Sequence, residues 1–96
     1  AYMETNYAEP LSISEVIERS HYSQRHFIRL FSAAYGMTPQ RYLLDVRIRH
    51  ASAMLRESGL SVTEIAMRCG FGDPNYFSRI FRKYSGSSPS EYRGTY

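Results

Sequence analysis

The sequence predicts an all-α fold in which two helix-turn-helix units are joined by a long linker helix. The first observation behind this prediction is a repeat: the segment LSISEVI that begins at Leu11 returns 49 residues later as LSVTEIA from Leu60. The second is a regular series of helix start and stop signals. The third is that no segment alternates as a half-buried strand does. We expect a single domain over 1–96, with the first unit at 11–36, the linker helix at 38–58 and the second unit at 60–93.

The first expected elements are the end of a helix over 1–8 and a complete helix over 13–20. Apolar and aromatic residues at the start of the chain have helical spacing, so we interpret the chain as a fragment of a longer protein. Ser12 and Glu15 have the spacing of a capping box, in which each side chain accepts a hydrogen bond from the other residue's backbone amide. This box predicts where the helix over 13–20 starts.

The next expected helix spans 24–35, between Ser23 as its N-cap and Gly36 as its stop signal. Its apolar residues recur at helical spacing and predict a buried stripe made of Phe27, Leu30, Phe31 and Ala34. The polar residues of this helix lie opposite the stripe. We therefore expect one face in the core and the other free to contact a partner.

A long helix is expected over 39–57, where Thr38 is the cap, Pro39 takes the first position and Gly59 follows the end. At the usual rise per residue it is about 27 Å long, which makes it a rigid spacer between the two units. Steps of four, three and four residues predict one continuous buried face, formed by Leu44, Ile48, Ala51 and Leu55.

The second unit is expected to contain helices over 62–69, 74–85 and 89–94. Its start signals are the capping box of Ser61 with Glu64 and the cap-proline pairs Asp73-Pro74 and Ser88-Pro89. Its stop signal is Gly86. The spacing of the first copy's stripe recurs, which predicts a second buried stripe made of Phe77, Ile80, Phe81 and Tyr84.

The two copies differ where their helices cross and turn. In the second copy, Ala66 permits a close crossing, and Gly70 suits a turn whose positive φ would cost most other residues about 1 kcal/mol. The first copy has Ile17 and His21 at these positions, which predicts a bulkier crossing and a less favourable turn. The second copy also has one added residue between its halves, where a turn accommodates it.

The second unit resembles the signature of the AraC/XylS family at Gly70-Phe71, 75–83, Gly86, Ser88-Pro89 and Tyr92-Arg93. The similarity extends over essentially the whole chain through Ser23, Phe27, Arg29, Phe31, Gly36, Pro39, Tyr42, Arg47, Ala51 and Leu55. The resemblance implies a bacterial transcription regulator. It implies further that two recognition helices lie in successive major-groove segments on one face of double-stranded DNA.

The expected base-reading residues lie opposite the core stripes of the two recognition helices. They are Arg25, Ile28 and Arg29 in the first unit and Asn75, Tyr76, Ser78 and Arg79 in the second. An arginine can donate two hydrogen bonds to guanine, an asparagine suits adenine, and an exposed isoleucine can pack on a thymine methyl. Arg79 suits a guanine or a phosphate, and Tyr76 contacts DNA or covers the core.

Contacts to the DNA backbone are expected from Ser23, Ser32, Arg41, Arg49, Arg82, Lys83 and Arg93. The capped helix N-termini also offer free amides to phosphates. Arg47 is expected either to contact a phosphate or to form an internal ion pair, for which Asp45 and Glu91 are the candidate partners. For arginines outside the recognition helices, a solvated structural role is an equal alternative.

Composition agrees with a DNA partner and excludes other classes of function. The net charge is +3 with a pI near 9.2, and the basic residues gather at 41–56 and 79–83. No apolar run reaches the roughly 18 residues of a membrane span. The single cysteine, Cys69, has no internal disulfide partner and is expected to be buried, so we expect a reduced cytoplasmic location.

No enzyme, metal or cofactor is expected. His21, His26 and His50 with Cys69 lack the paired spacing of zinc ligands. Ser85-Gly-Ser-Ser and Gly70-Phe-Gly72 are interpreted as turns because neither has the flanks of a catalytic or nucleotide-binding motif. The sequence therefore offers no group of catalytic residues.

We expect the fragment to be monomeric and its parent to dimerise through a companion domain, because the family usually carries effector sensing and dimerisation there. The residues leave both activation and repression open, and activation is the expectation of the two. The alternative function is a helical protein-interaction module that docks on RNA polymerase or another regulator through the second repeat. The two roles are compatible, and salt-insensitive binding to a protein without any shift of duplex DNA would favour the alternative.

Overall fold

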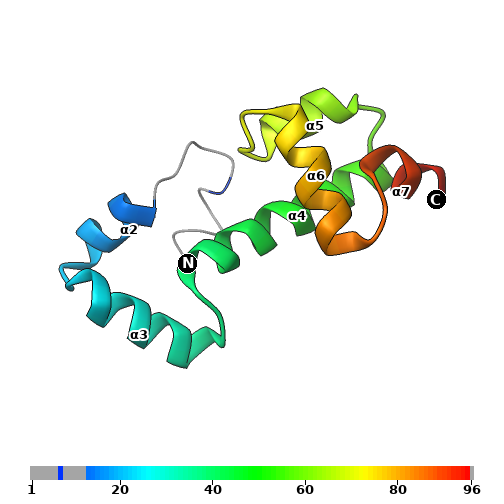
Figure 1. Ribbon diagram of the computed structural model, residues 1–96. Helices are drawn as coiled ribbons and strands as arrows, with labels where there is room; N and C mark the ends of the chain where they lie inside the picture. Colours follow the sequence, from blue (N-terminus) through cyan, green and yellow to red (C-terminus); the bar gives the residue numbers. More distant parts are fainter. Residues whose placement is uncertain (1–6, 8–12, 96) are drawn as a thin grey trace.

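A computed structural model of the protein describes Tyr7 and residues 13–95, with the side chains of the longer range described from residue 16 onward. The helices are α2 (Ile13–Ser20), α3 (Gln24–Tyr35), α4 (Pro39–Glu57), α5 (Val62–Arg68), α6 (Pro74–Ser85) and α7 (Pro89–Thr95). They form two lobes at the two ends of α4 (Figure 1), within overall dimensions of 43 × 22 × 21 Å. The described residues include no strand, which confirms the all-α prediction.

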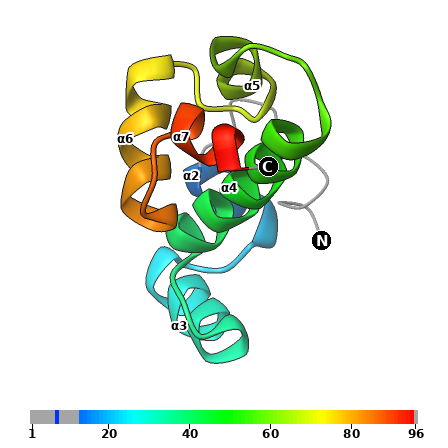
Figure 2. The same ribbon diagram turned by 90° about the vertical axis from the view of Figure 1, so that its right-hand side faces the viewer.

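The second lobe contains the larger hydrophobic core. Helices α5, α6 and α7 gather around the C-terminal half of α4 (Figure 2). The buried side chains of this core come from α4, α5, α6 and the connection between α5 and α6. The members of this second core are Ile48, Ala51, Leu55, Ile65, Ala66, Cys69, Phe71, Phe77 and Phe81. Phe77 and Phe81 have no exposed surface, which confirms the predicted stripe of α6 at these two positions. Ala66 is also fully buried where α5 crosses α6, as its small size predicts.

The first lobe has a smaller core. Val16 and Leu43 are its buried residues, and the half-buried aromatic rings of Phe27, Phe31 and Tyr42 pack against them. The predicted stripe of α3 is wrong at Leu30, which is 44% exposed, and at Ala34, which is also exposed. Helix α3 packs mainly against α2 and α4. These two helices cover only a narrow face of α3, so the residues at the far edge of its apolar stripe remain in solvent.

Helix α4 buries two faces because it serves both cores. Ile48, Ala51 and Leu55 face the second core as predicted, while Leu43 lies on another side of the helix and faces the first core. Leu44, the predicted member in the N-terminal half, is half-buried and also packs against the second core, so the prediction lacked only the second face that carries Leu43. The helix is a shared wall between two packed units, which fixes how the units are joined.

Local side-chain caps set most of the helix boundaries. The side chains of Ser23, Thr38, Ser61, Asp73 and Ser88 each accept a hydrogen bond from a backbone amide in the following first turn. The observed ranges agree with the predicted ones except at two C-termini, where α5 ends one residue earlier and α7 one residue later. The predicted box of Ser12 with Glu15 lies outside the described side chains.

Only one of the S-x-x-E segments in the second unit forms a reciprocal capping box. Glu64 pairs with Arg68 at 3.1 Å instead of reaching back to Ser61, so the predicted box there is half formed. In contrast, the Glu91 carboxylate accepts a hydrogen bond from the Ser88 amide at 2.9 Å while the Ser88 hydroxyl accepts one from the Glu91 amide. The Ser88 amide, the Ser88 hydroxyl and Arg82 lower the pKa of Glu91.

The turns of the two units differ as the sequence predicts. Gly70 has a φ of 87° in the second turn, and His21 has a φ of 64° at the equivalent place in the first. Helices α2 and α5 start 49 residues apart, whereas α3 and α6 start 50 residues apart, so the added residue lies between the two helix starts. The connection is 69–73 in the second unit against 21–23 in the first, because α5 also ends one residue earlier than α2 does. A left-handed backbone costs a residue with a Cβ roughly 1–2 kcal/mol, so His21 is a strained position.

His21→Gly is expected to stabilise the protein by about 0.5–1 kcal/mol, because glycine adopts the left-handed turn without strain. Urea unfolding followed by circular dichroism measures this change. His26→Gly is the matched control: inside α3 the same substitution should cost about 1 kcal/mol. A destabilised His21→Gly variant would show that the side chain contributes more than its backbone strain costs.

Tyr7 connects the beginning of the chain to both cores. It lies in a turn, so the predicted helix over 1–8 is wrong at this position, and the remaining residues of that range lie outside the described part. The Tyr7 carbonyl accepts a hydrogen bond from Arg47 Nε at 2.9 Å, and the Tyr7 ring stacks on His50 with centroids 3.9 Å apart. A Cβ at Gly70 would meet the same carbonyl, which adds a steric need for glycine to the positive φ. Tyr7 thereby helps to hold the second turn against α4.

Candidate nucleic-acid interface

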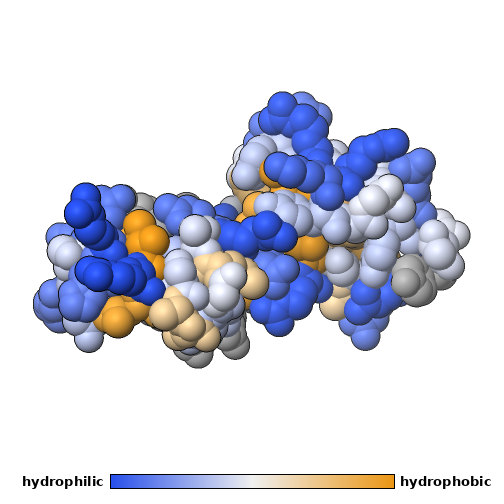
Figure 3. Space-filling view, turned by 60° about the horizontal axis from the view of Figure 1, so that its bottom comes forward, coloured by the Kyte–Doolittle hydropathy of each residue, from blue (hydrophilic) through white to orange (hydrophobic). Residues whose placement is uncertain are grey.

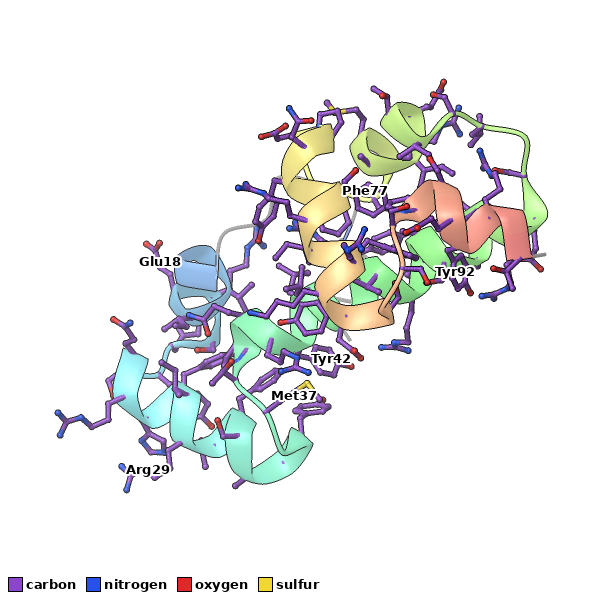
Figure 4. All side chains as sticks on the ribbon, turned by 45° about the vertical axis from the view of Figure 1, so that its right-hand side comes forward. Glu18, Arg29, Met37, Tyr42, Phe77 and Tyr92 are labelled. Atoms are coloured by element: carbon purple, nitrogen blue, oxygen red, sulfur yellow. The ribbon has the colours of Figure 1, made fainter. Side chains whose placement is uncertain are left out.

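The outer face of α3 presents two arginines and little else that is charged. Arg25 and Arg29 are exposed, and Arg29 projects away from the lobe (Figure 4). Helix α3 contains no acidic residue. Ile28 is half-buried instead of exposed as predicted, and it lines a shallow hollow with Gln24 and Arg25. The N-terminal half of α3 is thus a cationic surface with one apolar side chain at its floor.

The outer face of α6 repeats this arrangement at equivalent positions. Asn75 and Arg79 are exposed, Ser78 is half-buried and Tyr76 is 39% exposed. The ring of Tyr76 lies tilted against the buried Phe71, with centroids 6.2 Å apart. Tyr76 therefore covers part of the core and also presents a free edge. Lys83 adds a further exposed cation in the last turn of α6.

The structure keeps the two predicted base-reading sets apart, one on each lobe. Each set shares one helical face, and α4 separates the two helices (Figure 1). The long dimension of 43 Å exceeds one turn of duplex DNA, which is about 34 Å. A rod with a cationic helix on each lobe has the dimensions to contact two neighbouring major-groove segments.

Most of the predicted backbone contacts remain on the surface, although several have partners. Arg49 pairs with Asp45 at 3.4 Å, and Arg82 pairs with Glu91 at 3.5 Å. The arginine side chains of both pairs are more than 60% exposed, so the pairs contribute little to stability and exchange readily with other partners. Ser23 and Ser32 lie on α3 or directly before it, Ser23 exposed and Ser32 half-buried.

Arg93 does not fit its predicted role as a phosphate contact. Its guanidinium donates hydrogen bonds to the carbonyls of Leu55 and Ser58 at 3.2 and 3.3 Å, where α4 ends. The last carbonyls of a helix lack partners within the helix, and a cation is favoured at that end. Arg93 therefore joins α7 to α4 as a structural residue.

Arg47 has neither of the ion-pair partners that the sequence suggests. Asp45 pairs with Arg49 and Glu91 with Arg82, while Arg47 donates to the Tyr7 carbonyl. Burial lowers the pKa of Arg47, with Tyr76 and Cys69 opposing the shift. Burial likewise raises the pKa of the Cys69 thiol to about 11, which keeps that side chain an apolar member of the second core. These groups support the fold beneath the exposed face.

In the part of the chain that the structure describes, neither a metal site nor a membrane-spanning helix is found. Among the residues that the structure describes, no three potential metal ligands come together. None of the described helices is both long enough and apolar enough to cross a membrane. Hydrophilic side chains dominate the face drawn in Figure 3, with apolar side chains emerging on the α2–α3 lobe at the left.

Sequence reasoning missed the contact between Arg41 and Tyr84. The Arg41 guanidinium carbon lies 4.6 Å from the centre of the Tyr84 ring, which joins the start of α4 to the end of α6. Helical spacing predicts Tyr84 in the core stripe of α6, and no local pattern links two residues this far apart in the chain. The exposed arginines of α3 and α6, in contrast, follow directly from helical spacing.

Comparisons with known proteins agree with this geometry. A family model described as a helix-turn-helix domain matches residues 16–95. The HTH-type transcriptional activator RhaS of Klebsiella pneumoniae is 43% identical over 93 residues, which is 97% of this chain and 34% of that protein. The chain thus spans about a third of the length of this curated relative.

Solved structures with the same fold include DNA-binding domains. The DNA-binding domain of the global transcriptional factor AdpA, solved in complex with a target DNA, superposes with a TM-score of 0.95 at 34% identity, covering 99% of this chain and 86% of that one. A transcriptional regulator from Chromobacterium violaceum, described as containing an AraC-type DNA-binding domain, gives a TM-score of 0.86 at 32% identity over 97% of this chain and 83% of that one. The relatives that these comparisons name are transcriptional regulators.

Proposed function

The chain belongs to the AraC/XylS family of helix-turn-helix proteins, and from this we propose that it is the sequence-specific double-stranded DNA-binding domain of a bacterial transcription regulator. The observation that carries the proposal is the pair of exposed arginines, Arg29 and Arg79, at equivalent positions of two outward-facing helices. The similarity to a domain solved with its target DNA supports it.

In this proposal the whole chain acts as one domain with two recognition helices. Residues 11–36 and 60–93 form the two helix-turn-helix units, and 38–58 holds them at a fixed separation. Helices α3 and α6 enter successive major-groove segments on one face of the duplex, because the groove returns to the same face after about 34 Å. The rigidity of α4 then makes the spacing between the two half-sites a fixed requirement.

Base recognition is assigned to the exposed N-terminal faces of the two helices. Arg29 and Arg79 suit the O6 and N7 atoms of guanine, and Asn75 suits adenine. The remaining proposed base-reading residues are Arg25, Ile28, Tyr76 and Ser78. The half-buried Ile28, in its hollow beside Arg25, suits the methyl group of a thymine.

The proposed contacts to the DNA backbone come from residues that lie around these faces. They are Ser23, Ser32, Arg41, Arg82 and Lys83. Arg49 also belongs to the set, since its exposed pair with Asp45 exchanges readily, as that of Arg82 with Glu91 does. Arg93 leaves the set because its guanidinium bonds to carbonyls at the end of α4. The backbone amides in the first turns of α3 and α6 that lack partners within the helix add uncharged hydrogen-bond donors at the N-terminal ends of these helices.

We further assign the parent protein a non-enzymatic, cytoplasmic role in activating transcription, since its relative RhaS is described as a transcriptional activator. An activator can contact RNA polymerase as well as DNA. For such a contact on the second unit, α5 offers Met67, which is 52% exposed.

The dependence of DNA binding on salt tests the proposed function. A duplex selected from a random pool is titrated with the protein by fluorescence anisotropy at several salt concentrations. If about six phosphates are neutralised, the logarithm of the association constant should fall with the logarithm of salt concentration with a slope of about −5. Failure to select any duplex, or a slope near zero for binding, would contradict DNA binding through this cationic surface.

A further inference from the structure

We propose that a groove between the linker helix α4 and the recognition helix α6 holds a phosphate of the DNA strand that crosses between the two major-groove segments. This inference rests on the proposed function, since it names a third point of DNA contact between the two recognition helices. We call this feature the linker groove. It is lined by Thr38, Gln40, Arg41, Leu43, Leu44, Arg47, Tyr76 and Tyr84 and has a volume of about 460 Å³.

The chemistry of the linker groove suits an anion. Two of its lining residues are arginines, and no carboxylate is among them. The hydroxyl groups of Thr38, Tyr76 and Tyr84 and the amide of Gln40 can each donate a hydrogen bond. Leu43 and Leu44 form an apolar floor, which reduces competition from water and strengthens a charged contact. The combination matches a phosphate better than a neutral or cationic ligand.

Arg41 is the residue placed to hold the phosphate directly. Its side chain is exposed, and its guanidinium lies over the ring of Tyr84 at 4.6 Å. Stacking on an aromatic face limits the conformations of a long side chain while leaving the donors at its edge available. Arg41 also lies in the first turn of α4, where the positive end of the helix dipole favours an anion. The contact is therefore organised before DNA binds.

Arg47 lies in the same groove and is held by the fold. Its Nε atom donates to the Tyr7 carbonyl, and its side chain is half-buried. A partly desolvated guanidinium has lost some of its hydration, so an incoming anion recovers part of that loss. Arg47 thus places a second guanidinium in the groove that Arg41 lines.

The position of the groove identifies a DNA phosphate as the occupant. Tyr76 lines the groove and also belongs to the exposed reading face of α6, so the two surfaces are continuous. Thr38, the N-cap of α4, also lines the groove and is the last residue of the connection from α3. In the proposed complex, a duplex that contacts both α3 and α6 passes this stretch of surface. The strand that leaves one major-groove segment for the next is then the nearest anion.

Neutralising single phosphates tests the linker groove. In the selected duplex, each phosphate between the two half-sites is replaced in turn by an uncharged methylphosphonate, and affinity is measured for the wild type, Arg41→Ala and Arg68→Ala. Arg68 is the matched control because it is also an exposed, paired arginine but lines another part of the surface. Circular dichroism verifies that each variant is folded.

One or two adjacent central replacements should weaken binding of the wild type and Arg68→Ala by about fivefold to tenfold. The same replacements should leave Arg41→Ala unchanged, because that variant has already lost the contact, and its salt slope should be smaller in magnitude by about 1. Tyr84→Leu keeps Arg41 but removes its aromatic support. In this variant the central replacements should weaken binding by less than they do in the wild type, but by more than in Arg41→Ala. If no central replacement weakens the wild type, or if it weakens Arg41→Ala equally, the groove does not hold a phosphate. Absence of any selected duplex would instead contradict the proposed function itself.

Discussion

Phe77→Ala is expected to destabilise the protein by about 3–5 kcal/mol, the usual cost of truncating a fully buried phenylalanine to alanine. Phe77 has no exposed surface, and its ring contacts those of Phe71 and Phe81 at centroid distances of 4.8 and 5.6 Å. A domain of this size has a total stability of about 5–15 kcal/mol, so the loss is a large fraction of the whole. Urea unfolding monitored by circular dichroism measures it.

The matched variant is Phe27→Ala, which removes the equivalent ring from the first unit. Phe27 is only half-buried, and no residue of α3 is fully buried. The truncation is therefore expected to cost about 1–2 kcal/mol, since the cost scales with the buried area and the cavity left behind. Equal losses for the two variants would contradict the conclusion that the second core provides most of the stability.

Arg29→Ala and Arg79→Ala should each weaken binding to the selected duplex by about 1–3 kcal/mol and relax base preference in one half-site only. Each arginine is exposed on the outer face of its helix, so its removal should leave the fold intact. The loss arises because a bidentate contact to guanine is replaced by unpaired base edges. Competitive anisotropy with duplexes that carry a changed base in either half-site measures both effects.

The control for these two variants is Arg68→Ala, which removes the same charge from a paired residue on α5. It should weaken binding to all duplexes slightly and uniformly, because only the long-range attraction to phosphates is reduced. If Arg29→Ala and Arg79→Ala behave like this control, with an unchanged ratio of specific to nonspecific affinity, the two arginines do not read bases.

The helix boundaries could be predicted from the sequence because the caps are local. Ser23, Thr38 and Asp73 each bond to an amide two or three residues ahead, so the residues that decide a boundary lie next to it. Gly36 and Gly86 end their helices with positive φ for the same local reason. The reading faces of α3 and α6 follow from these boundaries by helical spacing alone.

Features that depend on distant parts of the chain could not be predicted in the same way. Periodicity shows which residues of a helix share a face, but only packing decides whether a neighbour covers that face. Leu30 lies on the apolar stripe of α3 yet is exposed, and Leu43 lies off the main stripe of α4 yet is buried. The pairing of Tyr7 with Arg47 joins residues with no local sequence relation.

The capping box of Ser88 with Glu91 was within reach of sequence reasoning, since it has the S-x-x-E spacing. The Ser61 segment has the same spacing, but there the carboxylate of Glu64 pairs with Arg68 on the next turn. The motif therefore defines the available partners but does not decide which of them is used, since Glu91 keeps its box while it also pairs with Arg82. The linker groove likewise depends on a partner from a distant part of the chain, because Arg41 of α4 stacks on Tyr84 of α6.

The central claim is that α3 and α6 bind two major-groove segments at the same time, at a separation fixed by α4. The most direct test is the affinity for the selected duplex after about five base pairs, half a helical turn, are inserted between its half-sites. The insertion turns one half-site to the opposite face of the DNA, so we predict that affinity falls to the level of nonspecific duplex. Specific binding that survives this insertion unchanged would contradict the claim.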